Sequence, residues 1–421
     1  MNPIRAIKGT RDILPGAVEA WQRVECASRS VFARHAYREI RTPILESTEL
    51  FQKTTGADTD IVTKEMYTFQ DRAERSITMR PEGTPGVVRA ALEAGMLRSG
   101  DIERLYYIGP MFRYERPQKG RYRQFAQIGA EAFGSPHPAL DAELIQMGML
   151  LMAELGIGGA RLAVNSVGHA ECRAGYRTAL ANALRPYVAS LCEDCVRRLD
   201  TNALRILDCK VPGCQPIKEK APSILDHLCD ACSAHFVEVR AYLDTLGVPY
   251  AIEPRLVRGL DYYTRTIFEI TGAGLGAQNA LCGGGRYDTL VASMGGPDTP
   301  AVGWAIGEDR LVMEAEAASS EAMGLRVDLY LVHVGEKALK EALVAADSLR
   351  KKGLAVRFDP ADRDMKKQMA RASSIGARFA LIIGDRELER GIYALKNLVD
   401  GRQQEVPGGG WDAIAREVGN G

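Results

Sequence analysis

The segment from Gly109 to Gly134 constrains this chain most, because it combines β-rich runs, turn residues and arginines within one short stretch. Tyr106 to Ile108 and Met111 to Glu115 are strand-like runs on its N-terminal side. A turn near Gly120 separates them from the return run at Arg123 to Ile128. This order predicts an antiparallel hairpin with a cationic loop.

Alternation along the strands predicts which side chains of the hairpin share a face. Arg113 and Glu115 fall on one face of the outgoing run, and Arg123, Phe125 and Gln127 on one face of the return run. Guanidinium groups hold phosphate oxygens in a bidentate fork. We interpret the segment as the floor of a phosphate-binding pocket. The alternative is a solvated, charged hairpin, as most charge runs are, and composition alone leaves it open.

Length and charge bound the class of protein. The 421 residues suit two or three domains. Lys plus Arg and Asp plus Glu both number 54, so nucleic-acid contacts must come from local patches. No run approaches the roughly 18 apolar residues of a membrane helix, and the N-terminus lacks a signal-peptide core. We expect a cytoplasmic protein without a membrane partner.

Apolar periodicity predicts the organisation of the first 250 residues. Residues 16–36 have helical spacing and precede a short strand at 37–42. A second helix is expected at 140–155. Residues 168–247 change to an Ala, Leu and Arg texture with helical periodicity, interrupted by a cysteine-bearing turn. We interpret this stretch as a helical insertion.

The C-terminal part has a different pattern. Residues 314–323 are polar and predict an interdomain linker. Beyond them the β-rich runs VDLYLVHV, LAVRFD and FALIIG alternate with helical patterns at 337–352 and 365–373. The alternation predicts a small α/β domain with a largely parallel sheet.

Six of the nine cysteines crowd into the insertion, in part as CEDC and CDAC pairs. They are Cys192, Cys195, Cys209, Cys214, Cys229 and Cys232. Two CxxC pairs can supply four thiolates to a tetrahedral zinc ion. The alternative is that they are small apolar residues on one face of a helix. The residues leave both hypotheses open, and no metal ligand is assigned.

Several segments resemble the histidyl-tRNA synthetases among the class II aminoacyl-tRNA synthetases. The 109–134 segment is similar to motif 2, residues 16–43 to motif 1, and AVGWAIGEDRLV to motif 3. LVRGLDYYTRT and GGGRYDTLV resemble two segments peculiar to this family, and KGTRDILP and MRPEGTPGVVRA also match it. The motif 3 match departs at Glu308 and Asp309, where the family commonly has Leu-Glu. The resemblance spans nearly the whole chain.

The resemblance implies an α+β fold. It implies a class II catalytic core over residues 1–322 with an antiparallel sheet, the helical insertion at 168–247, and an α/β anticodon-binding domain at 323–421. It further implies a homodimer, in which motif 1 packs across a twofold axis.

The implied activity is a histidine–tRNA ligase. Such an enzyme activates L-histidine with ATP and Mg²⁺, releases pyrophosphate, and transfers histidine from the adenylate to tRNA(His), releasing AMP. The implied catalytic residues are Arg113 and Arg258. Histidine would be bound by Glu82, Thr84, Gln127, Glu131, Tyr263 and Tyr287. ATP would be bound by Arg113, Glu115, Arg121, Phe125 and Arg310.

The transfer RNA is expected to meet two surfaces. The motif 2 loop, residues 118–123, would face the acceptor stem. A basic patch in the last domain would track phosphates, although surface lysines on helices are often only solvated. Its members are Arg350, Lys351, Lys352, Lys366, Lys367 and Arg371.

Three other functions are weighed against this one. A regulatory subunit of ATP phosphoribosyltransferase shares the catalytic fold without aminoacylation, and a kinase-linked sensor of uncharged tRNA is a binding module. Retention of the arginines and carboxylates named above, together with the C-terminal domain, argues against both. The third alternative is a metal-dependent phosphotransferase, and this sequence has no cluster of acidic residues that could hold its metal ions.

Overall fold

The computed structural model describes residues 4–56, 59–98, 101–118, 120–273, 279–318, 327–361 and 364–420. The chain divides into two compact units, the larger built mainly from residues 20–318 and the smaller from residues 327–420. Each unit has its own buried core. Among the described residues, no helix is both long enough and apolar enough to cross a membrane.

The larger unit is built on a sheet whose described strands run in the order β1-β5-β6-β11-β10-β9-β7-β8. The outermost pairs, β1 with β5 and β7 with β8, are parallel, and every other neighbour pair is antiparallel. The bounds are β1 Arg38–Glu39, β5 Glu103–Phe112, β6 Gln124–Phe133, β7 Arg161–Ser166, β8 Ala251–Ile252, β9 Thr264–Thr271, β10 Ala280–Arg286 and β11 Ala301–Gly307.

The predicted hairpin is present as β5 and β6, which pair from Glu103 opposite Phe133 to Phe112 opposite Gln124. One part of the prediction is wrong. The outgoing run is a single strand that ends at Phe112, so Arg113 lies beyond it. Arg123 precedes β6 and does not share a pocket face with Phe125, because its backbone N–H donates to Gly9 O at 2.7 Å and its guanidinium covers the Tyr114 ring at 3.8 Å.

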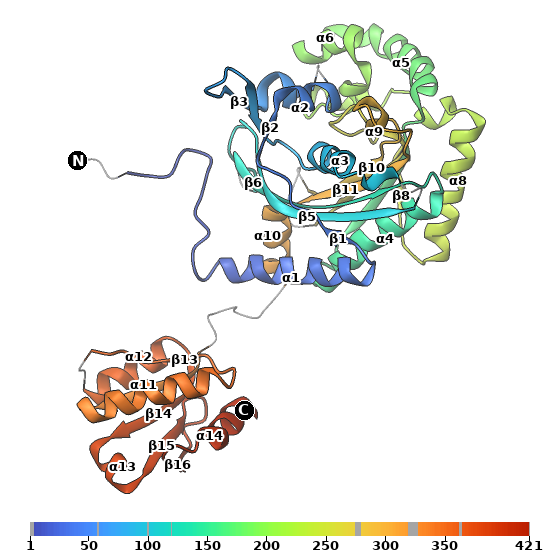
Figure 1. The fold of residues 1–421 in the computed structure, drawn as a ribbon. Helices are drawn as coiled ribbons and strands as arrows, with labels where there is room; N and C mark the ends of the chain where they lie inside the picture. The colour runs from blue at the N-terminus through green and yellow to red at the C-terminus, as the bar shows by residue number, and fades with distance from the viewer. Residues whose placement is uncertain are drawn as a thin grey trace. The chain divides into compact units, whose positions relative to one another are not determined.

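Helices cover the two faces of this sheet (Figure 1). Helices α1 (Val18–Arg34), α4 (Pro138–Glu154) and α10 (Glu308–Ala318) lie on one side, and α3 (Thr84–Glu93) lies on the other. Helix α4 is the helix predicted at 140–155; Pro138 occupies its first turn, and His137 accepts a hydrogen bond from the Ala139 backbone N–H. A small antiparallel sheet, β2 (Leu45–Ser47), β4 (Ser76–Met79) and β3 (Tyr67–Gln70), adjoins α2 (Thr48–Thr54).

The insertion is helical, as its texture predicts. It contains α5 (Ala170–Leu184), α6 (Glu193–Thr201), α7 (Gln215–Lys218) and α8 (Asp230–Thr245), with one 3₁₀ element in each connection except that between α6 and α7, which has two. Helix α8 packs against α4 and β9, which anchors the insertion to the sheet. The stretch between α6 and α8 has only short elements, so little regular secondary structure holds it together.

The smaller unit has a five-stranded sheet among its described residues, in the order β13-β12-β14-β15-β16. The prediction of a largely parallel sheet is wrong for half of it. Strand β12 is parallel to β13 and β14, whereas β15 is antiparallel to both of its neighbours, β14 and β16. The bounds are β12 Val327–Val334, α11 Glu336–Arg350, β13 Val356–Arg357, α12 Met365–Ser374, β14 Ala377–Gly384, α13 Asp385–Arg390, β15 Ile392–Asn397, β16 Gln403–Pro407 and α14 Trp411–Asn420.

The linker predicted at 314–323 begins later than expected. Helix α10 continues to Ala318, with Glu314 and Ala315 buried against the larger unit. The remaining part of the predicted linker lies outside the described residues.

Candidate functional site

A cavity of about 910 Å³ opens in the larger unit, over strands β6, β9, β10 and β11. The insertion supplies one of its walls. All the site residues predicted from the sequence line this cavity except Glu131. The lining members are Glu82, Thr84, Arg113, Glu115, Arg121, Phe125, Gln127, Arg258, Tyr263, Tyr287 and Arg310.

One part of the cavity, here called the guanidinium end, contains Glu115, Arg121, Phe125 and Arg310. Arg121 forms an ion pair with Glu115, whose side chain is 9% exposed, while Arg121 itself is 40% exposed. Arg310 donates to the backbone carbonyls of Gly120 and Ala280, at 3.2 and 3.1 Å. These bonds hold two cations near one another in a partly wet region, where the charge of Arg121 contributes to lowering the pKa of Arg310 after the larger effect of burial.

The opposite part, the carboxylate end, comprises Glu82, Glu131 and the polar groups around them. Both oxygens of Glu82 are engaged: one accepts from Thr55 Oγ1 at 2.7 Å and the other from Tyr262 Oη at 2.9 Å. Burial raises the pKa of Glu82, and these hydrogen bonds and the charge of Arg113 oppose that rise. The carboxyl is therefore held in place without a direct salt bridge.

Glu131 lies behind the cavity wall rather than on it. Its side chain is fully buried on β6, where one oxygen accepts from Thr84 Oγ1 at 2.6 Å and the other from Tyr287 Oη. Burial raises the pKa of Glu131 to about 8, against the opposing effect of these two hydrogen bonds. A side chain at Gly303 would collide with it, since a Cβ there would stand 1.8 Å from Glu131 Oε2. Glycine on β11 thus makes the room that Glu131 occupies.

Gln127 offers the carboxylate end an acceptor without a partner. Its side chain is 9% exposed and its Oε1 atom is buried with no hydrogen bond. A buried amide oxygen left unpaired costs free energy, which a donor from a bound molecule would recover. The neighbouring phenol ring of Tyr263 is buried at 4.9 Å from the ring of Tyr262, which fixes its place at this end.

Arg113 lies between the two ends. Its Nε donates to Pro81 O at 2.8 Å, its guanidinium stands 5.4 Å from the Phe125 ring, and its charge acts on Glu82. Arg113 is 19% exposed. It is therefore an oriented cation that a ligand in the cavity can reach.

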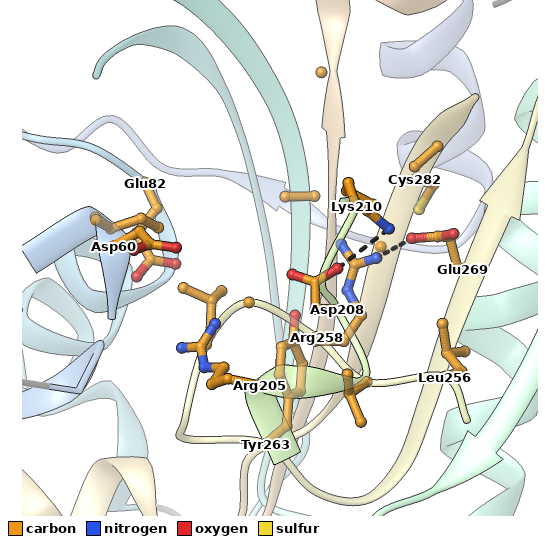
Figure 2. Close-up of a pocket in the computed structure, with 18 of the residues that line it drawn as sticks. Asp60, Glu82, Arg205, Asp208, Lys210, Leu256, Arg258, Tyr263, Glu269 and Cys282 are labelled. Carbon is orange, nitrogen blue, oxygen red and sulfur yellow. Dashed lines mark hydrogen bonds and ion pairs between the residues drawn. The ribbon is translucent and has the colours of Figure 1, made fainter. Parts of the chain in front are cut away.

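Arg258 is the second cation between the ends. It forms an ion pair with Glu269 on β9 and lies across β10, where a Cβ at Gly283 would stand 1.8 Å from its Nη2 atom. The absence of a side chain at Gly283 thus leaves the room that the guanidinium occupies over β10. Figure 2 shows Arg258 between Glu269 and Tyr263, with Asp208 and Lys210 of the insertion beside it.

Sequence reasoning missed several residues of this site. Tyr262 was seen within its motif but given no role, although it bonds Glu82. Glu269, the partner of Arg258, occupies an ordinary strand position with no local signal. Arg205, Asp208 and Lys210 of the insertion line the cavity, which only the tertiary fold brings about.

The departure in motif 3 has a defined structural role. Asp309 accepts from the Ala126 backbone N–H at 3.1 Å and pairs with Arg11 at 2.8 Å, tying α10 to β6. Glu308 is buried, which raises its pKa to about 8. Arg310 still lines the cavity despite the change.

The basic patch predicted in the smaller unit is already partly neutralised. Arg350 donates to the Val356 carbonyl. The ion pairs of the patch are Lys351 with Asp347, Lys352 with Asp412, and Lys367 with Asp364. A role in binding RNA stays a prediction.

The cysteines of the insertion do not meet as the two CxxC pairs suggested. Cys192 and Cys195 gather with Cys209 and Cys214, whereas the CDAC pair lies in a second group with His169 and Cys172. The hypothesis of one site built from both CxxC pairs is therefore wrong. His169 and Cys172 were missed, although HAEC repeats the same spacing.

An antiparallel sheet that carries arginines from motifs 2 and 3 over one cavity is the catalytic architecture of the class II aminoacyl-tRNA synthetases. Comparison with known proteins identifies the family within this class. The family model for histidyl-tRNA synthetase matches residues 9–311, and the anticodon binding domain model matches residues 328–409. The chain belongs to the histidyl-tRNA synthetase family.

Individual relatives agree with this membership. The chain is 49% identical to the histidine–tRNA ligase of Solibacter usitatus over 96% of both chains. It is 50% identical to that of Koribacter versatilis, over 96% of this chain and 94% of the relative. A crystal structure of the apo histidyl-tRNA synthetase of S. aureus is 37% identical and superposes with a TM-score of 0.82, covering 99% of this chain and 100% of the other.

Proposed function

We propose that this chain is a histidine–tRNA ligase, which joins L-histidine to ATP as an adenylate and passes the histidyl group to tRNA(His). The observation that carries the proposal is the convergence of Arg113, Arg258 and Arg310 on one cavity whose far end is lined by buried acceptors. The arginines suit the triphosphate of ATP, the buried acceptors suit an amino acid, and the reaction needs both substrates in one cavity.

The carboxylate end suits the α-ammonium of the amino acid. An ammonium has three N–H donors, and Glu82, Thr84 and Gln127, which all line the cavity, each carry an acceptor oxygen. The free Oε1 of Gln127 gains its missing bond, and the positive charge favours the ionised form of Glu82. Each acceptor thus binds the ammonium more strongly than it binds water.

Arg113 and Arg258 suit the reacting atoms. A carboxylate oxygen of histidine attacks the α-phosphorus of ATP, and pyrophosphate leaves with the electron pair of the broken P–O bond. Two anions approach one another, so the barrier depends on neutralising the phosphate oxygens. Fixed guanidinium groups do this without reorganising, because Glu269 and Pro81 already hold them.

The guanidinium end suits the nucleotide. We assign Phe125 and Arg310 to the two faces of adenine, Glu115 to its amino group, and Arg121 and Arg310 to the outer phosphates. Since Glu115 and Arg121 pair with each other here, ATP binding must separate them. Arg121 is 40% exposed, so water can solvate its guanidinium while the phosphates replace Glu115.

The imidazole ring suits the inner wall, where Tyr263 and Glu131 are its proposed partners and Tyr287 shapes the pocket. The ring reaches Glu131 by displacing the hydroxyl of Tyr287 or Thr84. An amino acid without ring nitrogens that displaced such a hydroxyl would leave Glu131 without a replacement hydrogen bond, which supports discrimination on the order of 10⁴.

Magnesium is proposed as an ion that arrives on the triphosphate. Among the described residues, the groups with metal-ligand spacing contain cysteine and histidine and no carboxylates. The acids whose charges act on Arg310 are each engaged by an arginine: Glu115, Glu269 and Asp309. The cavity therefore does not fit an Mg²⁺ ion held by the protein alone, and the arginines would act on the phosphate oxygens beside the Mg²⁺ that ATP carries.

The remaining partners are also proposals. A homodimer is supported by motif 1 and by the exposed apolar side chains of Leu45 and Phe69 on the small sheet. The acceptor stem would meet the loop at 118–123 and the anticodon would meet the smaller unit. We also propose a cytoplasmic location, where histidine, ATP and tRNA are available together.

The direct test is charging of a tRNA(His) transcript with radiolabelled histidine and ATP by the purified chain. We expect histidyl-tRNA to form, and pyrophosphate exchange to require histidine. If neither reaction proceeds while the protein is folded and binds ATP, the proposal is wrong.

A further inference from the structure

Two groups of four soft ligands stand in the insertion, apart from the residues assigned to the reaction. The first consists of Cys192, Cys195, Cys209 and Cys214, and the second of His169, Cys172, Cys229 and Cys232. Within each group, one ligand atom from every residue lies within 4.8 Å of the other three. All of these cysteines are free thiols.

The spacing of the ligand atoms is that of a tetrahedral metal site. A Zn–S bond of about 2.3 Å places the corners of a tetrahedron roughly 3.8 Å apart. Cys192 Sγ lies 3.9 Å from Cys209 Sγ. In the second group, His169 Nδ1 lies 3.0 Å from Cys172 Sγ and 3.5 Å from Cys232 Sγ. Four ligands round one point fit a metal, whereas disulfides would join them in pairs at about 2.05 Å.

Backbone geometry prepares the ligands for negative charge. Cys192, Cys229 and His169 occupy the N-cap positions of α6, α8 and α5. Three residues further on, Cys195, Cys232 and Cys172 therefore lie in the first turns of these helices. The N-terminal end of a helix favours a thiolate. Backbone N–H groups also donate to sulfur, from Cys192 to Cys214 Sγ at 3.3 Å and from Cys229 to Cys172 Sγ at 3.2 Å.

The histidine has a fixed orientation as well. Its Nδ1 atom faces the sulfurs, and its Nε2 atom lies 3.2 Å from a carboxylate oxygen of Glu171. A carboxylate behind the outer nitrogen is the usual arrangement for a metal-bound imidazole, because it fixes the tautomer and raises ligand basicity.

Packing alone does not explain the two groups. Small apolar cysteines belong in the core, yet Cys229 is exposed and Cys192 is only half-buried. The chain between α6 and α8 consists of elements of three and four residues, such as Pro212–Cys214 and Gln215–Lys218, and its buried side chains join the core of the larger unit instead of forming one of their own. A small segment of this kind is commonly held by a metal.

We propose that the insertion binds two structural zinc ions, one in each group of four ligands. Each site has four protein ligands and no open position, so neither zinc activates water or substrate. Their role is to fix the folded insertion. This proposal stands whether or not the proposed function is correct.

The two sites differ in where they lie. Cys192 and Cys209 line the cavity, and Cys209 stands between Asp208 and Lys210, which project beside Arg258 (Figure 2). The ligands of the second group do not line it. We infer that the zinc ion of the first group holds the wall of the cavity in place and that the zinc ion of the second group does not. This inference rests on the proposed function.

Metal content tests the proposal without any activity measurement. The chain is produced with zinc in the medium, without a polyhistidine tag, and purified without chelators, and metal is measured by mass spectrometry. We expect two zinc ions per chain, one in Cys209→Ser, one in Cys229→Ser, and two in the control Cys26→Ser, whose cysteine belongs to neither group. A wild-type chain with less than about 0.2 zinc that takes up none on reconstitution overturns it.

Cobalt substitution covers the case in which a variant does not fold. The wild-type chain, refolded with Co²⁺ in place of zinc, should show intense tetrahedral ligand-field bands and thiolate charge-transfer bands that saturate at two equivalents. A weak octahedral spectrum, or no saturable uptake, contradicts the proposal.

Kinetics then tests the difference between the sites. We expect Cys209→Ser to raise KM for ATP or histidine about tenfold and Cys229→Ser to leave both within about twofold. Equal effects of the two variants, with zinc contents as expected, overturn the inferred support of the cavity wall and leave the zinc sites standing. Absence of charging by the wild type with zinc bound contradicts only the proposed function.

Discussion

The two ends of the cavity are built on opposite principles. At the carboxylate end, Glu82 and Glu131 are buried and every oxygen accepts from a protein hydroxyl. At the guanidinium end, Arg121 is 40% exposed and forms an ion pair with Glu115. The side chains of the carboxylate end are buried and fixed by hydrogen bonds. Those of the guanidinium end are partly exposed to solvent and can exchange their partners.

The difference assigns a task to each end. Discrimination between amino acids needs buried groups that a wrong ligand leaves unpaired. Binding a triphosphate needs cations that can give up protein partners for phosphate oxygens. Variants at the two ends should therefore affect different substrates, and variants between them should affect the chemical step.

The largest effect is expected between the ends, for Arg258→Ala. We expect histidine-dependent pyrophosphate exchange to fall about 10³-fold, because a fixed donor to the developing phosphate charge is lost. Arg161→Ala, which removes an exposed arginine from the same sheet, should change nothing. Arg258→Ala combined with Glu269→Gln should remain as slow, and recovery in that double variant would show that the loss came only from the unpaired carboxylate.

Arg310→Ala should have the next largest effect, confined to the nucleotide. We expect kcat/KM for ATP to fall about 10²-fold, the value of one or two charge-assisted hydrogen bonds. KM for histidine should stay within about threefold. Initial-rate kinetics with each substrate varied in turn measures both, and an equal loss for histidine would contradict the separation of the ends.

Gln127→Leu should affect histidine and leave ATP binding unchanged. Loss of one acceptor for the ammonium should raise KM for histidine about 20-fold, with KM for ATP unchanged. Imidazole propionate, which lacks the ammonium, provides the matched control as an inhibitor. Its inhibition constant should be the same for both proteins, and a loss as large as that for histidine would assign Gln127 to another role.

The smallest effect concerns pH and stability. Because the pKa of Glu131 is raised to about 8, its neutral form stabilises the fold, and that stabilisation is lost as pH rises from the ordinary range of a glutamate through about 8. Glu131→Gln keeps the neutral state at every pH. We expect the Tm of Glu131→Gln relative to wild type to rise by on the order of 5 °C between pH 6 and 9. A constant difference over that range would show that Glu131 is already ionised at pH 6.

Much of the site could be predicted because its residues sit in contiguous motifs. The hairpin follows from turn residues and β-rich runs, and eleven of the twelve assigned residues line one cavity. Glu131 differs because alternation predicts a face of the sheet but not whether a ligand can reach it. Its two oxygens are covered by Thr84 and Tyr287, which come from other parts of the chain.

The remaining misses also have a tertiary cause. Arg123 turns away from the pocket because Gly9, more than 100 residues earlier, pairs with its backbone. The short strands β15 and β16 lack a strong local strand signal and form by pairing, β15 with β14 and β16 with β15. Local spacing identified the CxxC pairs, whereas their separation into two groups depends on Cys209, Cys214 and His169 arriving from other turns.

The central claim is that the carboxylate end selects an imidazole amino acid, which then reacts between the two ends with ATP bound at the guanidinium end. Pyrophosphate exchange by the wild-type chain, measured in turn with each of the twenty amino acids, tests it most directly. The account predicts exchange with histidine that exceeds every other amino acid by about 10⁴ in kcat/KM. Comparable exchange with a second amino acid, or none with histidine, would contradict it.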